Sequence, residues 1–137
     1  ALKEKNSNIK IYLSDPKGSC LYNYIKKKEF KSEGNSITEG IGSSRATKNF
    51  EKALIDDAYS IDDTTALTVL FDLIEKEGLS LGTSSGINVA GAIKLAQELG
   101  PNKTIVTILC DKSDRYQGKL FNKKFLMEKN LPYPRWL

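Results

Sequence analysis

The sequence predicts an α/β protein with three layers, in which helices cover both faces of a mostly parallel sheet. Three observations lead to this prediction. Strand-like and helical patterns alternate along the chain between residues 9 and 110. Residues 104–110 are almost continuously apolar and β-branched, which is typical of a strand buried on both faces of a parallel sheet. Two amphipathic patterns suitable for crossover helices lie between the strand candidates.

The first half of the chain begins with a strand predicted over residues 9–13, where β-formers alternate with other residues. Pro16 and Gly18 indicate a turn directly after it. A short helix is predicted over residues 19–24, and the polar, glycine-punctuated stretch 26–36 is typical of an exposed loop.

The second half carries the stronger helical patterns. A short edge strand is predicted over residues 55–61, and Asp62 or Asp63 then starts a helix that ends at Gly78. A second helix is predicted from about residue 85 to residue 99. The apolar positions that support the two helices and a further C-terminal helix are Leu67, Leu70, Phe71, Ile74; Ile87, Ala90, Ile93, Ala96; and Phe125, Leu126, Met127, Leu131.

Length and composition fit one ordinary domain. The chain has 137 residues, no apolar run long enough to cross a membrane and no leader pattern, so we expect a cytoplasmic or organelle-interior protein. Cys20 and Cys110 are far apart and form no CxxC pair, which argues against a disulfide framework or a zinc site, and Cys110 is predicted to lie in the core. Histidine is absent, which excludes Ser-His-Asp triads and histidine metal sites.

The basic residues favour a solvated surface over a nucleic-acid interface. The net charge is +4 and the isoelectric point is near 9.0, with lysines concentrated in residues 26–31 and 123–124. The basic residues are interleaved with glutamates and lie in loop-like stretches, and no aromatic stacking platform or known nucleic-acid module accompanies them.

The segment 79–86 is the main candidate for a small-molecule site. It runs from an apolar, strand-like piece through a turn bracketed by Gly82 and Gly86 into the second helix. Thr83, Ser84 and Ser85 place hydroxyls there, and the helix start adds free N–H groups. The alternative is a plain turn in which Ser84 or Ser85 only caps the helix. Parallel topology predicts that Ser84 and the polar turn 111–114 lie at the same sheet edge.

Several motifs, in this order, resemble those of cysteine synthases and, more broadly, of the fold-type-II pyridoxal-phosphate enzymes that include cystathionine β-synthase. The resemblance extends over the whole chain, so it is more specific than any one motif, although the bend at residues 40–42 is not a dinucleotide fingerprint because Arg45 replaces its last glycine. The motifs are Asp15-Pro16-x-Gly18-Ser19, Glu39-Gly40-Ile41-Gly42, Gly82-Thr83-Ser84-Ser85-Gly86-x-Asn88-x-Ala90-x-Ala92 and Ile108-Leu109-Cys110-Asp111-x-x-x-Arg115-Tyr116.

The resemblance implies a pyridoxal 5'-phosphate enzyme of transferase or lyase type that makes cysteine from O-acetylserine and sulfide by β-replacement. It implies that Ser84 hydrogen-bonds the pyridine nitrogen and that the backbone of Gly40, Ile41 and Gly42 lies against the cofactor. It also implies that Thr83 and Asp111 belong to the cofactor site. The alternative role for Asp111, Ser113 and Asp114 is to cap the start of a helix rather than to contribute polar groups near the cofactor.

The resemblance covers only the carboxyl-terminal half of such enzymes. Their Schiff-base lysine, substrate-carboxylate loop and phosphate cradle have no counterpart in this sequence, and residues 1–6 resemble the end of the helix that begins at that cradle. We therefore expect one α/β domain from a longer two-domain enzyme that is inactive without its amino-terminal half. Relatives form homodimers and bind serine acetyltransferase. Ser44 and Ser113 replace glycines found in many relatives, which puts the neighbouring backbone in question.

Three functions remain open on the sequence. The favoured one is a portion of a working cysteine synthase. The second is a non-catalytic relative that serves as a binding or regulatory module, for example for serine acetyltransferase, and the third is an α/β domain whose resemblance is architectural only.

Overall fold

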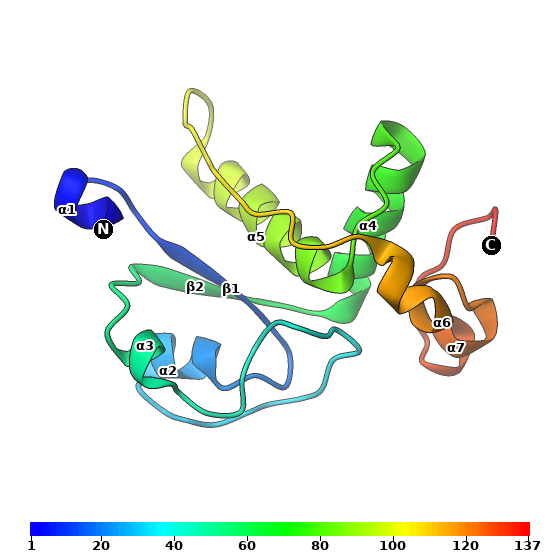
Figure 1. The fold of residues 1–137 in the computed structure, drawn as a ribbon, viewed down its shortest axis with the longest axis horizontal. Coiled ribbons are helices and arrows are strands. Elements are labelled where there is room, and N and C mark those ends of the chain that lie inside the picture. The colour runs from blue at the N-terminus through cyan, green and yellow to red at the C-terminus, as the bar shows by residue number, and fades with distance from the viewer.

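The computed structural model describes residues 1–137 and has α/β architecture, with a parallel pair of strands between layers of helices. β1 (Tyr12–Pro16) pairs with β2 (Asp57–Ile61) in a register that aligns Tyr12 with Asp57 and Pro16 with Ile61. In Figure 1, α2 (Leu21–Lys27) and α3 (Lys48–Glu51) lie on one side of these strands, and α4 (Asp63–Glu77) and α5 (Thr83–Leu99) lie on the other. The predicted fold class is confirmed.

The first strand lies further along the chain than predicted. β1 includes Asp15 and Pro16, which the sequence placed in a turn, and leaves out residues 9–11. Proline is tolerated because the N–H that donates to Ile61 O, at 3.2 Å, belongs to Lys17. The position that lacks an N–H therefore faces the open edge of the strand.

The neighbouring elements deviate by a few residues. A short helix, α1 (Leu2–Lys5), precedes β1. α2 begins at Leu21 and continues through Lys27, so it takes in residues predicted to be loop, and it ends where Lys28 adopts a positive φ of 60°. β2 lies within the predicted edge strand but begins at Asp57.

α4 has the predicted ends. Asp62 caps it by accepting a hydrogen bond from Thr65 N at 2.8 Å, and Gly78 ends it in the left-handed conformation with φ 68°. The predicted apolar face is buried at Leu67, Leu70 and Phe71.

α5 packs very closely on its neighbours. A Cβ at Gly86 would lie 2.8 Å from Ala66 O of α4, and one at Gly91 would lie 1.8 Å from Ser14 Oγ of β1. These two glycines let the helix approach both elements. The predicted apolar stripe is wrong at its end, because Ile93 is 44% exposed while Leu95 is buried.

Residues 104–110 do not form the predicted strand. They pair with no strand, and the nearest ladder contact is an isolated antiparallel bridge between Leu81 and Lys112, which is also the only strand-like pairing of residues 79–81. Val106 is 87% and Ile108 is 70% exposed, and Cys110 is exposed rather than in the core. The segment is extended, but no neighbouring strand in this chain satisfies its backbone groups.

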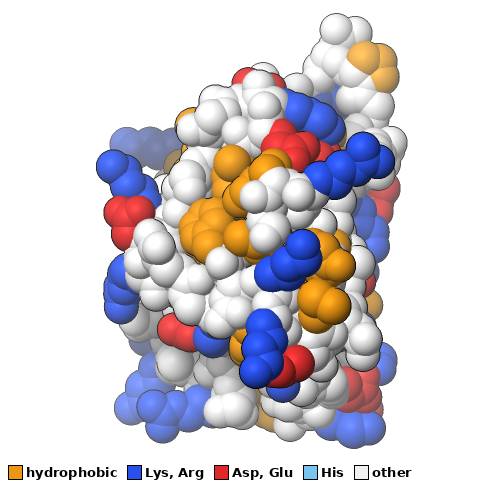
Figure 2. Space-filling model, turned by 90° about the vertical axis from the view of Figure 1, so that its right-hand side faces the viewer, with side chains coloured by type: hydrophobic (Ala, Val, Ile, Leu, Met, Phe, Trp, Pro, Cys, Tyr) orange, Lys and Arg blue, Asp and Glu red, His pale blue; other side chains and the backbone are white.

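The C-terminal region packs against α4. A 3-10 helix (Ser113–Tyr116), α6 (Gln117–Leu120) and α7 (Lys123–Glu128) bury Tyr116, Leu120 and Leu126 in a second core cluster. Trp136 donates to Glu75 at 2.8 Å and contacts the Phe71 ring edge-on. Figure 2 shows apolar side chains gathered on this end of the molecule, with basic side chains around them. None of the helices is long and apolar enough to cross a membrane.

Candidate functional site

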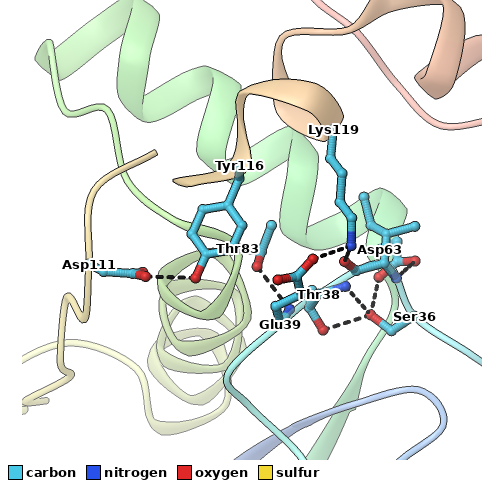
Figure 3. A network of polar contacts seen from close by, with 9 residues as sticks. Ser36, Thr38, Glu39, Asp63, Thr83, Asp111, Tyr116 and Lys119 are labelled. Atoms are coloured by element: carbon cyan, nitrogen blue, oxygen red, sulfur yellow. Dashed lines mark hydrogen bonds and ion pairs between the residues drawn. The ribbon is translucent and has the colours of Figure 1, made fainter. Parts of the chain in front are cut away.

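Three segments that are distant in the sequence meet at the N-terminus of α5. Gly82 N donates to Asp111 O at 2.8 Å, and Cys110 N donates to Ser85 Oγ at 2.9 Å. Glu39 N donates to Thr83 Oγ1 at 3.2 Å, which ties the glycine-containing loop to the same helix end (Figure 3). The predicted proximity of the α5 start and the turn at Asp111 is therefore observed, but they do not lie at a sheet edge, because neither residues 79–81 nor residues 104–110 form a strand.

The three hydroxyls of this helix start have different roles. Thr83 and Ser85 accept the hydrogen bonds from Glu39 and Cys110, so their oxygens hold neighbouring segments in place. The Ser84 hydroxyl makes no hydrogen bond with any group of the chain, and its oxygen is not sealed from solvent. The capping alternative is wrong for both serines, because the N-cap is Gly82 and no side chain caps the helix. Ser84 is thus the one hydroxyl of the three that has no hydrogen-bond partner within the chain.

Asp111 is held over Gly82 by Tyr116. Asp111 Oδ2 accepts from the Tyr116 hydroxyl at 2.6 Å, and this hydrogen bond, followed by burial, raises the pKa of Tyr116 above its usual value. Asp111 Oδ1 is buried and has no partner. A Cβ at Gly82 would lie 2.1 Å from that oxygen, so only glycine leaves room for this carboxylate.

The loop around Gly40 and Gly42 is fixed at its two flanks. On one side Ile37 N donates to Asp63 Oδ2 at 2.9 Å, and on the other Ser43 N donates to Ser19 Oγ at 2.9 Å. Gly40 and Gly42 have φ values of 72° and 79°, a region that side chains disfavour. Apart from Gly40 itself and its two neighbours in the chain, no residue has an atom within 4 Å of the Cβ position of Gly40, so the space beside this backbone is open.

A cavity of about 380 Å³ borders the same loop. Its walls include Lys17, Ile41 and several hydroxyl side chains, but not Thr83, Ser84 or Asp111. The cavity is therefore separate from the polar groups at the start of α5.

Ser44 and Ser113, at positions where we expected relatives to have glycine, are both accommodated. Ser113 is buried, its hydroxyl lies 2.6 Å from the Ser80 hydroxyl, and its N–H donates to Ser80 O. Neither Asp111, Ser113 nor Asp114 caps the 3-10 helix, so the capping alternative is wrong for this turn. Ser44 is exposed and lines the cavity.

Sequence reasoning missed several residues that shape this region. The sequence grouped Ser85 with Thr83 and Ser84 but did not indicate its bond to Cys110 N, and it gave Tyr116 only as part of a motif, whereas Tyr116 is 6% exposed and bonded to Asp111. Glu39 was noted only as part of a motif, and Lys119 was not singled out. No local pattern identifies Lys119, because its partners are about eighty residues away in the sequence.

Comparison with known proteins defines the class. A family model described as pyridoxal-phosphate dependent enzyme matches residues 1–111, and the chain belongs to this family. Its members use pyridoxal phosphate.

The relatives of this chain within the family include several cysteine synthases. The chain is 41% identical over 135 residues to cysteine synthase 1 of Neurospora crassa and 39% identical over 139 residues to the cysteine synthase of Dictyostelium discoideum. These matches cover 95% and 94% of this chain but only 36% and 37% of the relatives. The chain thus spans little more than a third of their length.

Solved structures of fold-type-II enzymes share the fold of this chain. The O-acetylserine dependent cystathionine β-synthase of Helicobacter pylori matches with a TM-score of 0.75 and 33% identity, over 86% of this chain and 36% of that one. The O-ureido-L-serine synthase structure has the same TM-score at 20% identity, which shows a shared fold.

The residues at the start of α5 fit one end of the family's cofactor. A pyridine nitrogen needs a hydrogen-bonding partner, and Ser84 offers a free hydroxyl there. The orphaned Oδ1 of Asp111 is a second polar atom without a partner in the same region. The open space beside Gly40 leaves its backbone accessible to a flat group.

Proposed function

We propose that this chain is the carboxyl-terminal portion of a pyridoxal-phosphate-dependent cysteine synthase, which replaces the acetoxy group of O-acetylserine by sulfide to give cysteine. The chain provides the pyridine-nitrogen end of the cofactor site. The observation that carries the proposal is the free hydroxyl of Ser84 between two hydroxyls that are already engaged.

Each proposed site residue has a distinct role. When bound, pyridoxal phosphate supplies an electron sink beside the substrate's α-carbon. The neutral hydroxyl of Ser84 would hold the ring nitrogen and would leave it largely unprotonated, so that the ring would be a weaker electron sink than with a carboxylate partner, which suits elimination. The backbone of Gly40, Ile41 and Gly42 would border the ring, and Thr83 holds this loop through Glu39.

Asp111 has a different part in the same proposal. Its side chain is oriented by Tyr116 and lies over Gly82, at the start of α5. The positive end of the helix dipole favours a carboxylate at this position. We assign its unpartnered oxygen to the polar edge of the cofactor site.

The proposal includes a complementary polypeptide. Residues 104–110 expose apolar side chains and unpaired backbone, and β1 is paired along one edge only. An amino-terminal half that adds parallel strands there would satisfy both, and it would carry the Schiff-base lysine and the phosphate-binding loop. Without it we expect the chain to be inactive. We further propose that the complete enzyme is a cytoplasmic homodimer and that it binds serine acetyltransferase.

We do not favour a non-catalytic module. Ser44 and Ser113 would favour that alternative if they disturbed the site, but Ser113 is hydrogen-bonded to Ser80 and Ser44 is exposed.

Reconstitution tests the function. The chain is mixed with the amino-terminal part of the Neurospora enzyme and pyridoxal phosphate, and absorption near the visible is recorded before and after O-acetylserine is added. We expect a lysine-bound cofactor band only in the mixture and a spectral shift with the substrate. A colourless mixture, or a band that never responds to O-acetylserine, would contradict the proposal.

Ser84→Ala tests the residue assignment in the same mixture. Loss of one hydrogen bond, about 1.4 kcal/mol, should weaken cofactor binding about tenfold in a fluorescence titration. Thr64→Ala is a matched control, because Thr64 is the second residue of α4, as Ser84 is of α5, and its side chain is exposed. Equal affinities of the two variants would show that Ser84 does not contact the ring.

A further inference from the structure

Lys119 of α6 contacts the loop that carries Gly40 and Gly42, although about eighty residues separate them in the sequence. Its Nζ donates to Ile37 O at 3.1 Å and forms an ion pair with the carboxylate of Glu39, the residue directly before Gly40 (Figure 3). One ammonium group thus holds both the backbone and a side chain of this segment.

The glycines themselves are not held. No hydrogen bond involves the backbone or side chains of Gly40, Ile41 or Gly42. Their position depends on the flanking residues, of which Glu39 is the nearest on one side and Ser43 on the other. Glu39 is fixed at two points, through its N–H by Thr83 and through its carboxylate by Lys119.

Lys119 extends from a rigid support. The next residue, Leu120, is 1% exposed in the core cluster beside α4, and Tyr116 one turn earlier is buried and bonded to Asp111. The contact of Lys119 therefore transmits the position of the C-terminal helices, and of the Asp111 turn, to the glycine loop.

We propose that Lys119 is a positioning residue that fixes Glu39, and with it the Gly40–Gly42 backbone, against the N-terminus of α5. Its importance for catalysis depends on the proposed function, in which this backbone lies against the cofactor. The effect of Lys119 on the position of the loop does not depend on the proposed function.

Global stability is the wrong readout for this contact. The Lys119 and Glu39 side chains are 33% and 56% exposed, and ion pairs of such exposure contribute little to unfolding free energy. The expected effect is local: residues 37–43 should become less ordered while the rest of the chain stays the same.

Nuclear magnetic resonance of the 137-residue chain, without cofactor, tests the positioning directly. In Lys119→Met the stem remains but the charge is lost. We expect the Glu39 amide to exchange with solvent about two- to fivefold faster, and the Gly40 and Gly42 amides to become more mobile. Amides of β2 should be unchanged.

Matched variants separate the charge from the packing. Lys124→Met removes a lysine of α7 that is 87% exposed and pairs only with Glu128, and it should leave the loop unchanged. Lys119→Arg should restore most of the order, and Glu39→Gln should loosen the loop as Lys119→Met does. If Lys119→Met and Lys124→Met gave the same Glu39 exchange, or if Lys119→Met loosened β2 equally, the proposal would be wrong.

A kinetic test in the reconstituted enzyme keeps this inference separate from the proposed function. There Lys119→Met should raise the KM for O-acetylserine more than it lowers kcat, with recovery in Lys119→Arg. A failed reconstitution would contradict the proposed function but leave the loop result intact. A loosened loop with unchanged KM would overturn the catalytic importance of Lys119.

Discussion

β2 and residues 104–110 are two extended, apolar segments with opposite surroundings. β2 is hydrogen-bonded to β1 and buries Ala58, Tyr59 and Ile61 between helices. Residues 104–110 pair with no strand and leave Val106 and Ile108 largely exposed. The second segment is held mainly from α5, where Ser85 bonds Cys110 N and Asn88 bonds Ile108 O.

The difference shows that a strand needs a neighbour as well as a suitable sequence. Residues 104–110 have the more β-branched composition of the two segments, but an extended chain gains its hydrogen bonds only from a partner. The exposed segment is the feature of this chain that a complementary polypeptide would change most.

The largest expected loss of stability comes from a substitution in the buried surroundings of β2, compared with the same substitution in residues 104–110. Ile87 is 0% exposed and packs in the cluster that contains Tyr59 and Ile61 of β2. Ile87→Ala should lower the free energy of unfolding by about 2–5 kcal/mol, whereas Ile108→Ala should change it by less than about 0.5 kcal/mol. Urea denaturation of the chain measures both, and equal losses would contradict the comparison. Ile108→Ala should become costly when the complementary half is bound.

A smaller effect concerns the close packing of the helices on the paired side. A Cβ at Gly86 would lie 2.8 Å from Ala66 O, a backbone atom that cannot turn away, so Gly86→Ala should cost about 1–3 kcal/mol by separating α4 from α5. Gly118, in α6, has open space around its Cβ position. Gly118→Ala should instead stabilise the chain by up to about 1 kcal/mol in the same urea experiment. Stabilisation by both changes would show that the two helices can separate without cost.

The smallest expected change in stability concerns Asp56, which lies just before β2. Asp56 accepts from Ile11 N at 2.8 Å and pairs with Lys3 at 2.6 Å. The Lys3 contact, followed by the Ile11 hydrogen bond, lowers the pKa of Asp56 to about 2. The unfolded value is near 3.9, so this contribution is fully present above about pH 4 and is lost as the pH falls through about 2.

The pH dependence of Asp56→Asn checks that assignment. Between pH 4 and pH 2 the unmodified chain should lose more stability than the variant, as measured by urea midpoints at each pH. Asp114→Asn, at a carboxylate without an ion pair, should follow the unmodified chain. If Asp56→Asn kept the full acid loss, its ion pair would not stabilise the strand pair.

Much of the fold could be predicted because it depends on local signals. The Asp62 cap, the Gly78 end and the apolar face of α4 all follow from short-range patterns, and all agree with the structure. The boundaries of β1 could not be predicted, because Pro16 is acceptable only when its missing N–H faces an open edge. That depends on where β2 lies.

The candidate site was predictable in its residue types but not in how they are used. The sequence identified Thr83, Ser84 and Ser85 together, and it could not decide which hydroxyl was free. That distinction depends on Glu39 and Cys110, which reach two of the three oxygens from distant segments. Whether Ser84 binds a cofactor remains a prediction.

The sequence by itself determined the α/β class, the two long helices and the family, because hydrophobic period, caps and ordered motifs are written in consecutive residues. Only the tertiary structure decided that residues 104–110 lie unpaired and that Lys119 holds the loop at Glu39. Both depend on which groups meet across long separations in the chain. Hydrogen bonds and ion pairs form between neighbours in space, and local pattern does not record those neighbours.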